Sequence, residues 1–371
     1  MTKTYLITGG MGFIGRALAA ELVARGHAVR LLDSLVEQVH GHVRENCVPA
    51  VPEGCDFIHA DVRDADAVRR ALSGVDGVFH LAAEVGVGQS MYEIERYTSA
   101  NDVGTAVLLQ ELIEEPVERV VVASSMSVYG EGFYRAPDGT RVADARRDKR
   151  AIEAGRWDPR VGNAALVPVA TDETKPVDLA SIYALGKYAQ ERAVMIACPA
   201  YGMECVGLRL FNVFGPGQAL SNPYTGVLAN FAARYLNGEA PTIFEDGQQK
   251  RDFVHVEDVA RAFRLAMETP AANGEVINIG SGRAYTVCDV ARLLGEAMGA
   301  GIEPEILGKS RSGDIRHCFA DIAKAREILG FEPRHRLETS LGPLVAWVAS
   351  QKAPDRGAEM RRHLEARGLV T

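Results

Sequence analysis

The chain has 371 residues, of which 47% are hydrophobic and 24% charged, and this size allows either one large unit or two domains. A formal net charge of −8 argues against nucleic acid or an anionic membrane surface as a partner. No run of eighteen apolar residues, signal-peptide pattern or C-x-x-C pair is present, so we expect a cytoplasmic protein with reduced cysteines and no metal site.

Strand-like and helical stretches alternate along the first half of the chain. This alternation predicts an α/β fold of the Rossmann type, with a doubly wound parallel sheet. The apolar or β-branched runs that predict strands are residues 3–8, 27–33, 56–59, 77–81, 119–124 and 204–210. The stretches that predict helices are residues 13–25, 64–72, 91–115 and 181–200.

The alternating pattern stops after Gly130. Residues 131–170 are rich in glycine, proline and charge and are longer than a simple connection, so they predict an insertion. Beyond Gly215 the chain mixes loops with short elements, and residues 353–369 predict a terminal helix. We therefore expect a dinucleotide-binding domain in residues 1–210 and a smaller α/β substrate-binding domain in residues 211–371, some of which returns to the first.

The string Thr8-Gly-Gly-Met-Gly-Phe-Ile-Gly15 lies between a predicted strand and a predicted helix. Gly9, Gly12 and Gly15 allow a tight turn there and let backbone amides approach a phosphate at the helix N-terminus. Asp33, eighteen residues past Gly15, suits the ribose hydroxyls and repels a 2′-phosphate, which favours NAD over NADP. The alternative for Asp33 is a solvated acid at a strand end.

The string Tyr183-Ala-Leu-Gly-Lys187 places a phenol and an ammonium one helical turn apart. A lysine beside a tyrosine favours the phenolate, so Tyr183 is a candidate base near neutral pH. Together with the glycine loop, this pair predicts the oxidation or reduction of an alcohol carbon by a nicotinamide.

Further motifs follow in a fixed order within residues 4–333. They are Asp61-Val62, Leu81-Ala-Ala83, Asn101, Ser124-Ser-Met-Ser-Val-Tyr-Gly130, Leu208-Arg-Leu-Phe-Asn-Val-Phe-Gly-Pro-Gly217 and Arg251-Asp-Phe-Val-His-Val-Glu-Asp-Val259. With the two strings above, they resemble the extended short-chain dehydrogenase/reductase family, and within it the nucleotide-sugar epimerases and dehydratases.

The resemblance implies a set of residues that bind NAD. Asp61 and Val62 would lie near the adenine, and Asn101 and Ser124 would lie close to the ribose and nicotinamide. The full cofactor set is Gly9, Gly12, Phe13, Ile14, Gly15, Asp33, Asp61, Val62, Leu81, Ala82, Ala83, Asn101, Ser124, Tyr183 and Lys187.

The resemblance also implies the catalytic residues. Ser125 would bond the reacting hydroxyl, Tyr183 would be the base, and Lys187 would hold the nicotinamide ribose while lowering the pKa of Tyr183. The alternative for Ser124 and Ser125 is that they only cap a strand end.

A nucleotide-diphosphate sugar is the substrate that the resemblance implies. Asn212, Arg251 and Arg311 would grip the diphosphate, because the arginine fork suits phosphate oxygens, with Phe244 near the nucleobase. Val85 would face the sugar. The alternatives are surface ion pairs for the two arginines and a core position for Phe244.

Residues 126 and 127 bear on the reaction type. The resemblance implies that relatives which dehydrate or decarboxylate sugars carry an acidic residue just before Val-Tyr-Gly. This chain has Met126 and Ser127 there. We therefore expect a 4-epimerase, which oxidises C4, lets the keto sugar rotate and reduces it again. The alternatives are an NAD-dependent 4-ketohexose reductase and a binding protein that senses the dinucleotide; a 3,5-epimerase stays open.

Two departures from the UDP-galactose 4-epimerases bear on the sugar. Val85 stands where those enzymes have a lysine, and they lack the insertion. That insertion resembles the one in epimerases of dTDP-linked 6-deoxyhexoses, such as dTDP-L-rhamnose; a UDP-sugar substrate (glucose, galactose or glucuronate) is the alternative. We expect the insertion to form part of the sugar pocket or a lid, with Trp157 as an anchor, or else a solvent-exposed excursion or a dimer contact.

The helices predicted at 91–115 and 181–200 carry apolar positions on more than one side. In the family such helices pair as a four-helix bundle, so a homodimer is implied. Periodicity alone equally allows a buried helix in a monomer.

Overall fold

The computed structural model describes residues 2–41, 50–218, 226–311, 314–350, 362–363 and 365–370. Its centre is a sheet of seven strands in the order β16-β11-β5-β4-β1-β2-β3, in which every neighbouring pair is parallel. The strands are β1 (Thr4–Thr8), β2 (Ala28–Asp33), β3 (Cys55–His59), β4 (Gly77–His80), β5 (Arg119–Ser125), β11 (Glu204–Leu210) and β16 (Val276–Ile279).

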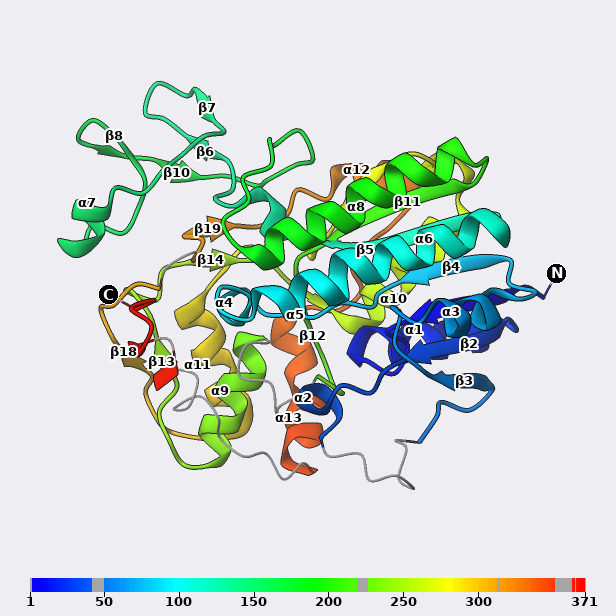
Figure 1. Cartoon of the computed structure of the whole chain (residues 1–371). Helices are drawn as coiled ribbons and strands as arrows, with labels where there is room; N and C mark the ends of the chain where they lie inside the picture. The colour runs from blue at the N-terminus through cyan, green and yellow to red at the C-terminus, as the bar shows by residue number, and fades with distance from the viewer. Residues whose placement is uncertain are drawn as a thin grey trace.

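Helices cover both faces of this sheet, as Figure 1 shows. Successive residues of β1 point to opposite faces, so Ile7 enters one hydrophobic core and Leu6 the other. The predicted doubly wound α/β sheet is therefore confirmed. The first face carries α1 (Phe13–Val23), α10 (Val256–Glu268) and α12 (Ala323–Leu329); the second carries α3 (Ala65–Leu72), α6 (Gly104–Glu114) and α8 (Ile182–Ala200).

The helix expected at 91–115 differs from its prediction. It begins three residues later, and a π-helical turn (Ser99–Val103) separates α5 (Ile94–Thr98) from α6. The turn contains Asn101, whose side chain bonds the backbone of Glu84. Short helices that were not predicted are α2 (Glu37–His40), α4 (Val87–Ser90) and the 3-10 turns Met126–Tyr129 and Pro270–Ala272.

The chain beyond residue 211 builds a separate hydrophobic core, yet β16, α10 and α12 return to the central sheet. The division into two domains near residue 210 stays a prediction. The helices around this core are α9 (Val227–Leu236), α11 (Val287–Met298) and α13 (Leu337–Ser350). The short strands are β12 (Asn212–Phe214), β13 (Thr242–Ile243), β14 (Lys250–Arg251), β15 (Phe253–His255), β17 (Tyr285–Thr286), β18 (Glu305–Ile306) and β19 (His317–Cys318).

The insertion has its own small fold and projects from the upper left of the body in Figure 1. Tyr134, Ala145 and Leu166 form its core. Its elements are β6 (Tyr134–Arg135), β7 (Arg141–Val142), α7 (Lys149–Glu153), β8 (Arg160–Val161), β9 (Ala164–Ala165) and β10 (Val167–Pro168).

Two further expectations concern the C-terminal helix and membrane-spanning segments. The terminal helix predicted at 353–369 falls largely outside the described residues. In the part of the chain that the structure describes, no helix is long and apolar enough to cross a membrane.

Candidate active site

A cavity of about 650 Å³ opens at the carboxyl ends of the central strands. Crevices at this edge are where open parallel sheets bind ligands. Every site residue predicted from the sequence lines the cavity except Asn101. The structure therefore brings together the glycine loop, the serine and tyrosine–lysine motifs and Val85 with the arginines and Phe244. The latter belong to the part of the chain beyond residue 211 that lies outside the central sheet, here called the second lobe.

The glycine loop needs its glycines for space as well as for conformation. Gly9 has φ +69°, and a Cβ there would lie 2.9 Å from the Cα of Ala82. At Gly15 a Cβ would lie 2.5 Å from the carbonyl oxygen of Gly9. Among the described residues no side chain caps the N-terminus of α1, so its first amides are available to a phosphate.

Asp33 fixes the loop from the end of β2. Its carboxylate accepts hydrogen bonds from the backbone amides of Met11 (3.0 Å) and Leu35 (2.8 Å). Asp61, at the end of the neighbouring strand, accepts two bonds from the Arg63 guanidinium, at 2.9 and 2.6 Å. The hydrogen bonds from Arg63 lower the pKa of Asp61. Hydrogen bonds therefore hold both carboxylates in place beside the cavity.

Ser125 and Tyr183 both line the cavity and hydrogen-bond to each other. Ser125 ends β5, and its Oγ accepts hydrogen bonds from the backbone amide (3.2 Å) and hydroxyl (3.0 Å) of Ser127. Tyr183 lies in the first turn of α8, where its amide donates to Ser90 Oγ at 3.0 Å. Burial raises the pKa of Tyr183, and a hydrogen bond with Ser125 opposes this increase. The lowering of this pKa by Lys187, which the sequence analysis expects, stays a prediction.

Lys187 is 3% exposed and donates from Nζ to Gln190 Oε1 at 2.6 Å. Burial lowers the pKa of Lys187 to about 7. The Gln190 amide nitrogen donates in turn to Thr105 Oγ1 (2.8 Å) and to the carbonyl of Ala82 (3.2 Å). The sequence analysis did not identify Gln190, although its position three residues after Lys187 puts both side chains on one helix face.

Ser124 is tied to a buried ion pair behind the cavity. Its hydroxyl donates to Glu191 Oε2 at 2.6 Å, and Glu191 binds the Arg209 guanidinium through both oxygens at 2.9 and 2.7 Å. These three side chains are buried. The sequence analysis did not identify Glu191 or Arg209; the acid directly follows Gln190 on α8.

Asn101 is not among the residues that line the cavity. Its Oδ1 accepts from the Glu84 amide at 2.7 Å, and its Nδ2 donates to the Glu84 carbonyl at 3.2 Å. Because both polar atoms are used in this way, Asn101 holds the loop that carries Ala83 and Val85. Its expected place close to the ribose stays a prediction.

The second lobe supplies the far end of the cavity. The Arg251 guanidinium donates to the carbonyls of Lys250 and Arg316, both at 2.9 Å. Arg311 donates to Asp314 Oδ2 at 2.7 Å, and its guanidinium lies 4.6 Å from the centre of the Phe244 ring. The two arginines thus project cationic groups, and Phe244 an aromatic face, into one cavity.

The side-chain amide of Asn212, on the cavity wall, has a buried oxygen that could still accept a hydrogen bond. The Oδ1 atom of Asn212 makes no hydrogen bond within the described part of the chain. A buried polar atom without a partner carries a desolvation cost, which a ligand could remove. This supports Asn212 as a ligand contact.

The insertion does not contribute to the cavity. Residues 131–170 are all described, and none of them lines it. The expectation that the insertion forms part of the sugar pocket, with Trp157 as an anchor, is therefore wrong for this structure. The insertion has its own small core and makes polar contacts with the second lobe. The lid, solvent-exposed and dimer-contact alternatives stay predictions.

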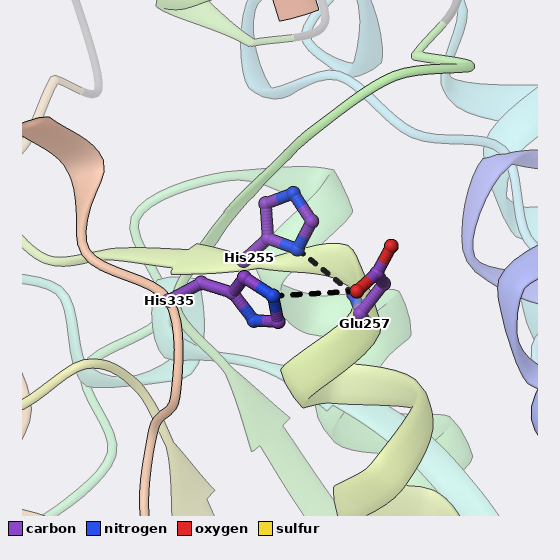
Figure 2. Close-up of side chains that lie close together, drawn as sticks. All are labelled: His255, Glu257 and His335. Carbon is purple, nitrogen blue, oxygen red and sulfur yellow. Dashed lines mark hydrogen bonds and ion pairs between the residues drawn. The ribbon is translucent and has the colours of Figure 1, made fainter. Parts of the chain in front are cut away.

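A cluster of His255, Glu257 and His335 could hold a metal ion by its spacing (Figure 2). His255 Nδ1 accepts from the Glu257 amide at 3.3 Å and so caps α10, while His335 Nδ1 bonds Asp258 at 3.1 Å. The imidazoles lie 4.3 Å apart, and the cluster is outside the cavity lining. We assign these residues to the capping of α10.

Comparisons with known proteins agree with this geometry. The dTDP-L-rhamnose 4-epimerase of Burkholderia thailandensis is 37% identical over 355 residues, covering 94% of this chain and 96% of that protein. The UDP-glucose 4-epimerase of Thermotoga maritima, solved with UDP-glucose, superimposes with a TM-score of 0.76 at 32% identity, covering 93% of this chain and 98% of that one.

A second solved structure is the UDP-glucose 4-epimerase of Thermus thermophilus in complex with NAD. It has a TM-score of 0.74 and 30% identity, and the match covers 94% of this chain and 99% of that one. A family model described as the NAD dependent epimerase/dehydratase family matches residues 5–150 and 159–280. The chain belongs to the NAD dependent epimerase/dehydratase family.

Proposed function

We propose that this protein is an NAD-dependent nucleotide-sugar 4-epimerase. The observation that carries the proposal is the placement of Ser125, Tyr183 and Lys187 on the wall of one cavity, between the glycine loop and the Phe244–Arg311 pair. A dinucleotide site and a nucleotide-sugar site would then meet at the reactive hydroxyl. Relatives named as 4-epimerases over nearly the whole chain support the same reading.

The residues present fit NAD. The open N-terminus of α1 and the side-chain-free faces of Gly9 and Gly15 suit a pyrophosphate, and Asp33 suits the ribose hydroxyls. When bound, NAD supplies an acceptor for a hydride and returns that hydride. Residues 1–210 would mainly hold this cofactor, and residues 211–371 would mainly hold the nucleotide sugar.

Tyr183 is the base in this proposal. It takes the proton of the sugar 4-hydroxyl as C4 is oxidised, and it returns a proton when the ketone is reduced. Ser125 holds the hydroxyl oxygen, and the charged form of Lys187 stabilises the phenolate. Arg251 and Arg311 anchor the diphosphate while the keto sugar turns, so that the hydride returns to its other face.

A dTDP-linked 6-deoxyhexose, such as dTDP-L-rhamnose, is the sugar nucleotide that we propose. The name and coverage of the Burkholderia relative support it. Val85 supports it too, since this apolar side chain is 42% exposed and lines the cavity, and it offers a surface for a methyl group rather than a carboxylate. A UDP-sugar remains the alternative, because other relatives are UDP-glucose 4-epimerases.

Proton NMR with purified protein and no added cofactor tests the proposal. The protein is incubated in D2O with dTDP-L-rhamnose, UDP-glucose or UDP-glucuronate, beside a Tyr183→Phe control. We expect a new anomeric signal without deuterium incorporation, and none with the control. Conversion only after NADH and a 4-keto sugar are supplied would instead establish a reductase. Deuterium entering C3 or C5 would indicate enolisation.

We also propose a homodimer formed through α5–α6 and α8. These helices contact each other and run side by side in Figure 1. The exposed apolar side chains are Ile94 on α5, Val103 on the π-helical turn that follows it, and Leu185 and Ile196 three turns apart on one face of α8. Sedimentation velocity should show a dimer that Leu185→Glu with Ile196→Glu converts to a monomer. A monomeric wild type would refute this.

A further inference from the structure

One arginine of the insertion contacts the segments of the second lobe that line the far end of the cavity. Arg147, 9% exposed in its side chain, forms ion pairs with Glu245 and with Glu131 (3.2 Å). Its Nη2 also donates to the backbone carbonyl of Asp314. One guanidinium of the insertion therefore reaches two separate segments of the second lobe.

The first of these segments is held in an unfavourable conformation. Glu245 has φ +55°, and Leu35 is the other described non-glycine residue with positive φ. A left-handed conformation costs a side-chain-bearing residue about 1–2 kcal/mol and persists only where the surroundings fix it. The Glu245 amide donates to the Lys309 carbonyl at 2.8 Å, and its carboxylate lies between Arg147 and Arg316 (2.9 Å).

Both segments lead directly to candidate nucleotide contacts. Glu245 follows Phe244, whose ring lines the cavity. Asp314 accepts the hydrogen bond of Arg311 at 2.7 Å, and Arg311 lies over the Phe244 ring. Arg147 therefore bonds to Glu245, which directly follows Phe244, and to Asp314, which binds Arg311.

We propose that Arg147 is a positioning residue for nucleotide binding: it fixes Glu245 and Asp314, and thereby aligns the Phe244 ring with the Arg311 guanidinium. This rests on the proposed function, because it takes Phe244 and Arg311 as nucleotide contacts. The insertion then sets the affinity for the nucleoside diphosphate without touching it. The reacting centre at Tyr183 is unaffected.

Arg147→Lys tests the proposal, since lysine keeps the charge but cannot bond both segments with one planar fork. Arg147→Met combined with Glu245→Gln is the second variant, because it removes both charges of this pair. Glu131 keeps its hydrogen bonds from the amides of Arg316 and His317, and Arg316 keeps Asp158 and Asp246. Arg150→Lys, an exposed arginine of the same insertion, is the matched control. The Kd of dTDP and of UDP is measured by calorimetry, together with kcat, KM, NAD content and melting temperature.

We expect both Arg147 variants to raise Kd and KM about tenfold, equivalent to about 1.4 kcal/mol, with kcat within about twofold of wild type. The Arg150 control should match wild type. If the double variant does not fold, the lysine variant decides.

Unchanged Kd in a folded Arg147→Lys protein would overturn the inference. So would equal losses in kcat, NAD content and nucleotide affinity, which indicate general damage. If wild type binds neither dTDP nor UDP, the proposed function itself fails, and the inference fails with it.

Discussion

Gln190 holds the Lys187 ammonium, and its removal should change how activity depends on pH. Gln190→Met keeps the side-chain length but removes the oxygen that accepts from Lys187 Nζ at 2.6 Å. A hydrogen bond to a charged group contributes about 1.5–3 kcal/mol, and about 1.4 kcal/mol corresponds to one pKa unit. Starting from about 7, the pKa of Lys187 should fall by roughly one to two units.

The direction of the effect follows from the role of the lysine. The charged form stabilises the Tyr183 phenolate, so activity should decline as pH rises through the pKa of Lys187. In Gln190→Met this decline should move to lower pH by about one to two units, which reduces kcat/KM at pH 7 by roughly five- to fiftyfold. The assay is kcat/KM for the nucleotide sugar between pH 5 and 9.

Gln190→Glu is the matched control for this experiment. A carboxylate at the same position still accepts from Lys187, and its negative charge raises the pKa of that ammonium. The decline in activity should therefore move to higher pH. If the profiles of the Met variant and the wild type superimpose, the positioning role of Gln190 is refuted.

Three further outcomes follow from the geometry. Gly15→Ala places a Cβ 2.5 Å from the Gly9 carbonyl oxygen, so we expect the free energy of unfolding to fall by about 1–3 kcal/mol and little NAD to co-purify. The NAD content is measured by absorbance after denaturation, and a full content would contradict this. The pKa of Lys187 is about 7 when folded and 10.5 when unfolded, so the unfolded chain binds more protons between these values and burial of this lysine makes wild type less stable as pH falls. The melting temperature of Lys187→Met should therefore rise relative to wild type from pH 10 to pH 7, and a gap independent of pH would refute the reasoning. Glu191→Leu strands the buried Arg209 guanidinium and should cost about 3–5 kcal/mol in urea denaturation, whereas a loss below about 1 kcal/mol would show that the pair is not buried as described.

The sequence could identify the parts of the site that depend on local patterns. The Gly9–Gly15 loop and the spacing of Tyr183 and Lys187 are fixed by a turn and by one helical repeat, so neighbouring residues alone reveal them. The alternation of short apolar runs with amphipathic stretches likewise predicts the parallel sheet and its two covered faces.

Contacts between distant segments could not be predicted in this way. Gln190 and Glu191 are polar residues of a helix, and only the packing of α8 on β5 and β11 shows that they are buried. Asn101 was placed near the ribose by resemblance, but a π-helical turn directs both of its polar atoms to Glu84. The local pattern of an insertion does not reveal which way it turns, so the contacts of Arg147 were not foreseen.

The most direct test of the account follows a hydride at C4. The nucleotide sugar that the enzyme converts is prepared with deuterium at C4 and incubated in ordinary water without added cofactor. We expect the 4-epimer to retain the deuterium at C4, because the same hydride leaves and returns within one closed site. Loss of deuterium from C4 to water, or a keto product that accumulates with reduced cofactor, would contradict the proposed 4-epimerase.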